Sequence, residues 1–338
     1  MKKYSFLVSG LALMMLATGT VKAETASQMT EGVLSIEKVV NIGESLMPNA
    51  EFTFDIESVN VAGETKDNLA VYSGIVEGIE KTSASYTNGD KTESKNASIN
   101  FNGVKFSNVG IYRYKVTEKQ GMVPGVTYDK SSYIIDVYVV KNEQESLVPK
   151  YIVSYQENQK EKKPVKFNNQ LKTTSLTVKK SVTGNAGDKN KEFGFTITLT
   201  ADQFYKESEK ISAKLVDKVG SITERQLLVG VNKFTLKDGE SLSIDKLPIG
   251  ITYKVEEDAV EGYKQTATID KDGIAGTGAP EAYNFTEQVS DDTPDAIVVT
   301  NNKNINTPTG VAMAIAPYAV MTLVGIGGVL YFVKNKKA

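Results

Sequence analysis

The chain has 338 residues, enough for two domains that each bury a sizeable core. Its formal net charge is −2 and no basic stripe runs along it, which argues against a nucleic-acid partner. Histidine and cysteine are absent, which excludes disulfide bracing and both Ser-His-Asp and Cys-His catalysis. Histidine is also the commonest zinc and copper ligand in proteins. We therefore expect no metal site, and we expect no cofactor.

The first 23 residues have the pattern of a secretory signal peptide. A charged start at residues 1–3 precedes an apolar stretch at residues 6–16, and Val21-Lys22-Ala23 is a small-x-small cleavage site. An uncleaved anchor is the alternative, but this apolar stretch is too short to span a bilayer. We therefore expect residues 1–23 to be removed on export.

Between residues 24 and 305 the sequence predicts an all-β fold of short strands. Runs with apolar residues at alternate positions are rich in Thr, Val, Ile and Tyr. They are residues 34–40, 51–56, 114–118, 133–140, 151–155, 165–169, 176–180, 193–199, 253–257, 267–269 and 297–301. Turn dipeptides separate them at Asn88-Gly89, Asn102-Gly103 and Asp238-Gly239. Short strands separated by turns are typical of immunoglobulin-like β-sandwiches.

Two segments depart from this pattern. Residues 201–212 have the spacing of a helix of two or three turns. Residues 81–100 are strongly polar, which indicates a long surface loop or a solvated hairpin.

Three polar side chains share the core-facing parity of their strands. Strand alternation places Lys38 on the same face as the apolar residues at positions 34, 36 and 40. Glu118 ends an inward-facing set in residues 114–118, and Asn169 ends another in residues 165–169. The second half of the chain repeats all three, as Lys180, Glu257 and Asn301.

This repeat indicates two copies of one fold. The Lys, Glu and Asn occur in the same order with similar spacing, and Glu51-Phe52-x-Phe54 matches Glu192-Phe193-x-Phe195. The joint must lie between Asn169 and Leu176, a span too short for a free tether. We therefore expect two tandem domains at residues 24–171 and 172–305.

Inward Lys, Glu and Asn side chains can react if they meet. Burial lowers the pKa of a lysine and raises that of a glutamate, and a neutral amine is a nucleophile toward a side-chain carboxamide. A neutral carboxyl can donate to the amide carbonyl and pass a proton to the departing ammonia. For any one residue the alternative is a strand-end position exposed to solvent. Six residues in the same order in two halves favour covalent Lys–Asn amides.

Residues 306–338 have the layout of an anchoring segment. Asn306-Thr307-Pro308-Thr309-Gly310 precedes the apolar Val311 to Val333, which as a helix reaches about 34 Å and crosses a hydrocarbon core. The basic tail, residues 334–338, stops on the cytoplasmic side. An ordinary single-pass anchor has this layout, but the Pro-Thr-Gly resembles a Gram-positive cell-wall sorting signal. That resemblance implies sortase cleavage after Thr309. The first two motif positions depart from the common Leu-Pro-x-Thr-Gly order, which leaves open which sortase reads it.

Four motifs carry a wider family resemblance. They are Tyr114-Lys115-Val116-Thr117-Glu118, Leu176-Thr177-Val178-Lys179-Lys180, Gly310-Val311-Ala312-Met313 before Ala316-Pro317-Tyr318, and Leu330-Tyr331-Phe332-Val333-Lys334. Over essentially its full length the exported region resembles the major (backbone) pilins of streptococcal sortase-assembled pili, of the T-antigen type. The resemblance implies Cna-B-like sandwiches with isopeptide bonds Lys38–Asn169 and Lys180–Asn301. It also implies that Glu118 and Glu257 take the catalytic role.

The resemblance further implies a polymerising lysine, the amine that receives Thr309 of the next subunit. The matching segment is Lys162-Lys163-Pro164-Val165. Counting back from Asn169 selects Lys162, and Lys163 is the adjacent alternative. From the sequence alone, this segment is otherwise a solvated charge run.

The sequence therefore predicts a structural pilus shaft subunit, polymerised by a sortase and not an enzyme beyond its own cross-linking. The expected partners are other copies of itself, the sortase, accessory pilins and peptidoglycan, and a host-surface ligand is a further candidate. The expected location is a wall-anchored surface pilus, with transient membrane retention through the C-terminal helix. A single-copy wall-anchored adhesin with the same domains but no acceptor lysine is the alternative. A secreted hydrolase is disfavoured, because each trio offers one carboxylate and an acid–base pair needs two.

Overall fold

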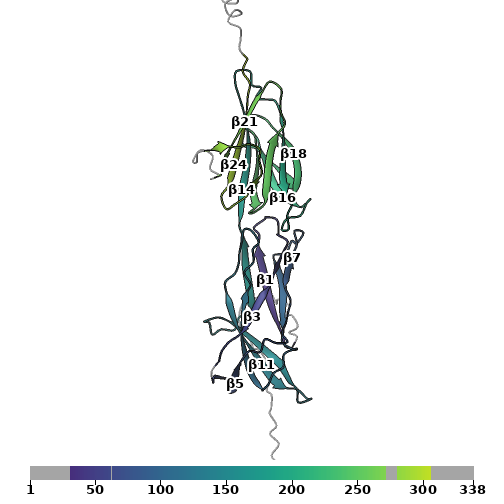
Figure 1. The fold of residues 1–338 in the computed structure, drawn as a ribbon, viewed down its shortest axis with the longest axis vertical. Coiled ribbons are helices and arrows are strands. Elements are labelled where there is room, and N and C mark those ends of the chain that lie inside the picture. Colours follow the sequence, from purple (N-terminus) through teal and green to yellow (C-terminus); the bar gives the residue numbers. More distant parts are fainter. Residues whose placement is uncertain (1–30, 62, 272–279, 306–338) are drawn as a thin grey trace, which may run out of the picture.

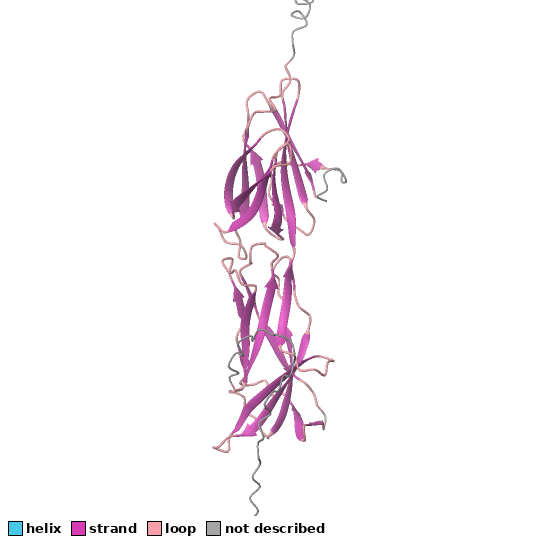
Figure 2. Cartoon of the chain, turned by 180° about the vertical axis from the view of Figure 1, so that it is seen from behind, coloured by secondary structure: helices cyan, strands magenta, loops and turns pink. Residues whose placement is uncertain are grey.

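The computed structural model describes residues 31–61, 63–271 and 280–305, and within these ranges the chain forms strands and loops with no helix (Figures 1 and 2). The predicted signal peptide, residues 1–23, and the predicted sorting segment, residues 306–338, lie outside the described residues. In the described part of the chain we find no helix with the length and hydropathy needed to span a bilayer. The prediction of an all-β fold is confirmed.

The first half of the chain forms two large sheets around one core. One sheet has the order β10-β13-β1-β8-β6, with β1 Val33–Asn41, β6 Glu80–Lys81, β8 Ser94–Asn100, β10 Val126–Thr127 and β13 Val165–Leu171. The other has the order β12-β11-β9-β5-β4 with β3 beside β9; its strands are β3 Phe54–Ser58, β4 Thr65–Lys66, β5 Leu69–Ser73, β9 Gly110–Glu118, β11 Ser132–Lys141 and β12 Leu147–Gln156. A short ribbon pairs β2 Ala50–Phe52 with β7 Ala84–Tyr86. Ile36, Phe167, Tyr114 and Ile135 are fully buried between the two sheets.

The second half repeats this plan farther along the molecule (Figure 1). One sheet has the order β17-β16-β19-β14-β24-β21-β22, with β14 Thr173–Thr183, β16 Lys210–Val216, β17 Ile222–Leu228, β19 Ser241–Pro248, β21 Lys264–Asp270, β22 Glu281–Ala282 and β24 Asp295–Asn302. The other has the order β18-β15-β20-β23, with β15 Phe193–Thr200, β18 Gly230–Leu236, β20 Thr252–Glu257 and β23 Gln288–Val289. Val178, Ile197, Tyr253 and Ile297 are fully buried in its core.

In each half the first and last strands are parallel neighbours. Strand β1 pairs with β13, with Lys38 opposite Phe167, and β14 pairs with β24, with Lys180 opposite Val299. Because side chains alternate along a strand, the residue two positions beyond each partner lies on the same face. That residue is Asn169 in the first half and Asn301 in the second.

The helix predicted over residues 201–212 is wrong. The Asp202 carboxylate accepts the main-chain N–H groups of Phe204 and Tyr205 at 2.7 Å each, which closes a turn instead. Tyr205 is fully buried in the second core, and from Lys210 the chain continues as strand β16.

The prediction of a loop or solvated hairpin over residues 81–100 also needs correction. Strand β8 lies between β1 and β6 in the first sheet, and β7 pairs with β2. Ala97 and Ile99 point into the core. Many of the polar residues in this segment lie on the outward-facing side of β8. They outnumber the two inward-facing apolar residues, so the sequence pattern did not indicate a strand.

Asn88, in the turn after β7, joins the two halves. Its Nδ2 donates to the carbonyls of Met47, at 2.6 Å, and Phe204, at 2.7 Å, and its Oδ1 accepts the Lys206 N–H at 3.0 Å. The Asn49 N–H also donates to the Phe204 carbonyl, at 2.8 Å. Asn88 is only 7% exposed, so its amide is a buried connector that binds the 201–206 turn to the first half.

Candidate functional site

The first candidate site brings together Lys38, Glu118 and Asn169. Lys38 comes from β1, Glu118 from the end of β9 in the opposite sheet, and Asn169 from β13 beside β1. All three are buried, as the strand parity predicted. The trio therefore spans the sandwich and involves its first and last strands.

One carboxylate oxygen contacts both nitrogens of this trio. Glu118 Oε1 lies 3.1 Å from Lys38 Nζ and accepts a hydrogen bond from Asn169 Nδ2 at 2.9 Å. Lys38 Nζ also donates to the Phe167 carbonyl at 3.3 Å. A single oxygen between an attacking nitrogen and a leaving nitrogen is well placed to move a proton from one to the other.

The second half of the chain repeats the lysine–glutamate contact and buries the matching asparagine. Lys180 Nζ lies 2.9 Å from Glu257 Oε1 and donates to the Val299 carbonyl at 3.3 Å. Asn301 is 1% exposed and follows Val299 by two positions on β24. Lys180, Glu257 and Asn301 form the second trio, in which Lys180 contacts Glu257 and Asn301 lies buried on the strand that pairs with the lysine strand.

Burial acts on the charges of the first trio. It lowers the pKa of Lys38 and raises the pKa of Glu118, although each side chain partly opposes the shift of the other. Burial also lowers the pKa of Lys180. Both shifts in the first trio favour the neutral amine and neutral carboxyl that amide formation needs.

A repeated pair of phenylalanines completes each site. Lys38 Nζ lies 5.1 Å from the centre of the Phe52 ring, and Lys180 Nζ lies 4.4 Å from that of Phe193. Phe54 stands opposite Glu118 and Phe195 opposite Glu257 in the strand register. The Glu-Phe-x-Phe repeat is visible in the sequence, and the structure adds that its first ring lies near the amine and its second phenylalanine lies opposite the glutamate.

Sequence reasoning missed two polar neighbours of the trios. The Asp129 main-chain N–H donates to Asn169 Oδ1 at 2.8 Å, and Gln265 Nε2 donates to Glu257 Oε2 at 2.6 Å. Asp129 lies in a loop, where no periodicity marks it. Gln265 lies on β21 opposite Asn301, a pairing that only the fold reveals.

The predicted acceptor lysine lies on an exposed connection between β12 and β13. Lys162 pairs with Tyr155 through an isolated bridge, and we find no hydrogen bond or ion pair for its ammonium group among the described residues. The neighbouring Lys163 Nζ donates to Gln156 Oε1 at 2.8 Å. Both lysines are exposed, and Lys162 has the freer amine. Residues 306–310, including Thr309, lie outside the described residues.

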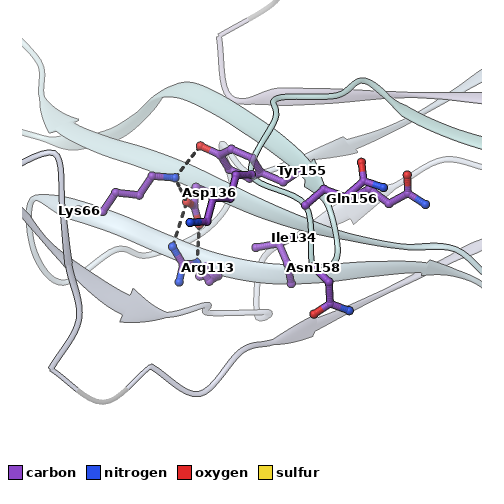
Figure 3. Close-up of a pocket in the computed structure, with 9 residues that line it drawn as sticks. Lys66, Arg113, Ile134, Asp136, Tyr155, Gln156 and Asn158 are labelled. Atoms are coloured by element: carbon purple, nitrogen blue, oxygen red, sulfur yellow. Dashed lines mark hydrogen bonds and ion pairs between the residues drawn. The ribbon is translucent and has the colours of Figure 1, made fainter.

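A charged network lies beside the end of β12, the strand that precedes this connection (Figure 3). The buried Asp136 carboxylate accepts from Arg113 Nε at 2.7 Å and from Lys66 Nζ at 2.8 Å, and Lys66 also donates to the Tyr155 hydroxyl. These side chains line a cavity of about 380 Å³. Lys66 bonds both Asp136 on β11 and Tyr155 on β12, so the network links Tyr155 to the sheet that holds β9 and β11. Tyr155 in turn pairs with Lys162.

In comparisons with known proteins, each half of the chain matches a family model. Residues 34–172 match the family described as Spy0128-like isopeptide containing domain, and residues 174–303 match a domain of unknown function, DUF7601. A pilin of Streptococcus pyogenes serotype M1 is 40% identical over the full length of both chains.

Solved structures agree with this. The major pilin T3.2 of S. pyogenes is 41% identical with a TM-score of 0.74, over 81% of this chain and 98% of that one. Another S. pyogenes major pilin is 36% identical with a TM-score of 0.73, over 82% of this chain and all of that one. The chain therefore belongs to the family of streptococcal major pilins.

Proposed function

We propose that this protein is the structural subunit of a surface pilus shaft, braced by Lys38–Asn169 and Lys180–Asn301 isopeptide bonds and joined covalently to its neighbours. The observation that carries this proposal is the repeated buried trio. Each half holds a Lys, a Glu and an Asn in the same strand register, with apolar rings around the amine. Removing one partner of a buried ion pair is strongly destabilising, while replacing the whole pair by apolar groups is often neutral. Two retained copies therefore favour a chemical role.

The reaction within each trio is an amide exchange. Neutral Lys38 Nζ attacks Asn169 Cγ, a carbon–nitrogen bond forms, and Glu118 passes the amine proton to Nδ2, which leaves as ammonia. Lys180, Glu257 and Asn301 perform the same exchange in the second half. The two domains, residues 24–171 and 172–305, are then each closed by a bond between their first and last strands.

Polymerisation is assigned to a sortase, with Thr309 of one subunit transferred to Lys162 of the next. Support comes from the exposed Lys162 ammonium, which has no partner within residues 31–61, 63–271 and 280–305, and from the connection that presents it. Accessory pilins and peptidoglycan are the further partners proposed. The C-terminal segment is proposed to retain the chain in the membrane until transfer.

Co-expression of the chain with its matching sortase tests polymerisation. We expect a ladder of covalent multimers that resists heat and detergent, abolished by Lys162→Ala and kept by the matched Lys163→Ala. Loss of the ladder in Lys163→Ala alone would move the acceptor by one residue. A wild-type chain that forms no ladder would favour the single-copy adhesin.

A further inference from the structure

The Asp129 main-chain N–H occupies a special place in the first trio. It donates to Asn169 Oδ1 at 2.8 Å and, more weakly, to Glu118 Oε2 at 3.2 Å. The amide oxygen that would become negative during attack therefore already faces a donor. The other carboxylate oxygen, Glu118 Oε1, contacts Lys38 Nζ and Asn169 Nδ2.

The Asp129 side chain fixes this donor in position. Its carboxylate accepts the Ser131 N–H and the Asn168 N–H at 2.7 Å each. Burial alone would raise the pKa of Asp129, but these hydrogen bonds outweigh it and lower the pKa. Because Asn168 directly precedes Asn169 on β13, the charged carboxylate ties its own loop to the strand that carries the reacting amide.

We infer that the Asp129 main-chain N–H stabilises the oxyanion of the first cross-linking reaction, and that the Asp129 carboxylate is the positioning residue that aims it. The inference rests on the proposed isopeptide chemistry. Attack of Lys38 Nζ on Asn169 Cγ moves the carbonyl electron pair onto Oδ1, where this N–H meets it. When ammonia leaves with the proton carried by Glu118, the carbonyl re-forms and the donor remains on the new amide oxygen. Preorganised donors of this kind contribute about 100-fold to 1,000-fold to a rate.

The second trio is built differently. The buried Asn301 Oδ1 has no hydrogen-bond partner among the described residues, and Gln265 Nε2 donates to the Glu257 carboxylate instead. Among the described residues, no donor faces the atom on which the oxyanion of Asn301 would form. The first bond is therefore expected to form faster than the second in the same molecule.

Cell-free synthesis of the full chain gives a synchronous start for measuring both reactions. Samples stopped with acid at intervals are digested, and the two cross-linked peptide pairs are quantified by mass, each lighter by roughly 17 Da for the lost ammonia. In the wild type we expect the Lys38–Asn169 pair to appear first. Asp129→Ala should slow that pair at least about 10-fold, while the Lys180–Asn301 pair keeps its rate.

Two further variants separate positioning from a merely structural effect. Asp129→Asn, which keeps one acceptor oxygen, should restore part of the lost rate. Asn142→Ala loosens a comparable turn, whose N–H donors are Gln144 and Ser146, and should leave both rates unchanged. Because the Asp129 charge helps to raise the pKa of Lys38, Asp129→Ala should also move the Lys38 limb of the pH profile to lower pH. The inference requires in addition that the rate at the pH optimum falls, and an unchanged rate at the optimum would overturn it.

The outcomes distinguish the two levels of the argument. If both cross-links form and Asp129→Ala leaves the first rate unchanged, the oxyanion role is wrong and the isopeptide chemistry stands. If the wild type forms neither cross-link, the proposed chemistry itself is wrong.

Discussion

Lys38 Nζ lies 3.1 Å from Glu118 Oε1, and neither side chain has any exposed surface. Lys180 and Glu257 repeat this relationship at 2.9 Å. Desolvation of two charges commonly outweighs their attraction in such a pair. The arrangement is therefore a poor stabiliser as an ion pair. Under the proposed chemistry, amide formation would consume the amine and remove the lysine charge that is difficult to bury.

The first prediction concerns mass. Residues 24–305 should weigh roughly 34 Da less than their sequence requires, because each bond releases one ammonia. Glu118→Ala should restore half of the deficit and Glu257→Ala the other half, measured by intact-protein mass spectrometry. Glu256→Ala is the matched control, since this carboxylate adjoins Glu257 but is exposed, and it should leave the deficit unchanged. A wild-type protein of full mass would sink the central proposal.

The second prediction concerns pH and uses Asn169→Ala, which keeps the Lys38–Glu118 pair but removes the amide acceptor. Burial lowers the folded-state pKa of Lys38 below 10.5, so the unfolded chain binds more protons between that pKa and 10.5. The free energy of unfolding should therefore rise with pH there. Burial raises the pKa of Glu118 above 4.5, so the free energy should fall as pH rises from 4.5 through the folded-state pKa.

Denaturant titrations across pH would measure this dependence. The reference carries Lys38→Met and Glu118→Gln in addition to Asn169→Ala, so that subtraction removes the titration of other groups. As pH rises, the difference in free energy of unfolding between the two variants should fall in the acid range and rise in the alkaline range. A difference that stays constant from acid to alkaline pH would show that the pair is not desolvated as described.

Much of the site could be predicted from the sequence because strand parity is a strong constraint. A Lys, Glu or Asn at an inward position must be buried if the strand forms, and all six are. The donors around the trios could not be predicted in this way. Asp129 acts through its main chain from a loop, and Gln265 meets Glu257 only because β21 pairs with β24.

The wrong fold predictions have local causes. Residues 201–212 have helical spacing, but the Asp202 side chain closes a turn there and Tyr205 is buried in the core, so no helix forms. Strand β8 was not predicted from the sequence, because its outward-facing residues are polar and few of its residues face inward. Asn88-Gly89 was correctly predicted as a turn, but its contact with Phe204 depends on how the two halves meet.

The third prediction concerns that contact. Asn88→Ala would remove the hydrogen bonds that Asn88 makes with the Phe204 carbonyl and the Lys206 N–H, at about 0.5–1.5 kcal/mol each. The Phe204 carbonyl would keep the Asn49 N–H. We expect each half to remain folded while their relative orientation loosens. NMR relaxation should then show two halves that reorient independently, and small-angle scattering should show a broader range of shapes.

The control for this variant is Asn96→Ala, because Asn96 lies exposed on β8 and away from the junction. It should leave relaxation and scattering as in the wild type. Equal tumbling of the two halves in Asn88→Ala and in the wild type would show that the other junction contacts suffice.

The last prediction concerns the path of force along a shaft joined from Thr309 to Lys162. Tension would enter at residue 162, load β13, cross into β14 and leave beyond β24. A Lys180–Asn301 bond would bypass the residues between them, about 120 in number, and hide roughly 400 Å of extensible chain at about 3.3–3.6 Å per residue. A Lys38–Asn169 bond would have another task, because it would hold the loaded β13 to the parallel β1. Single-molecule pulling between residues 162 and 309 should show no long unfolding step in the wild type. Glu257→Ala should reveal a step of that size, whereas Glu118→Ala should not, since residues 31–161 lie outside the loaded path. A long extension in the wild type would contradict either the second bond or the proposed attachment points.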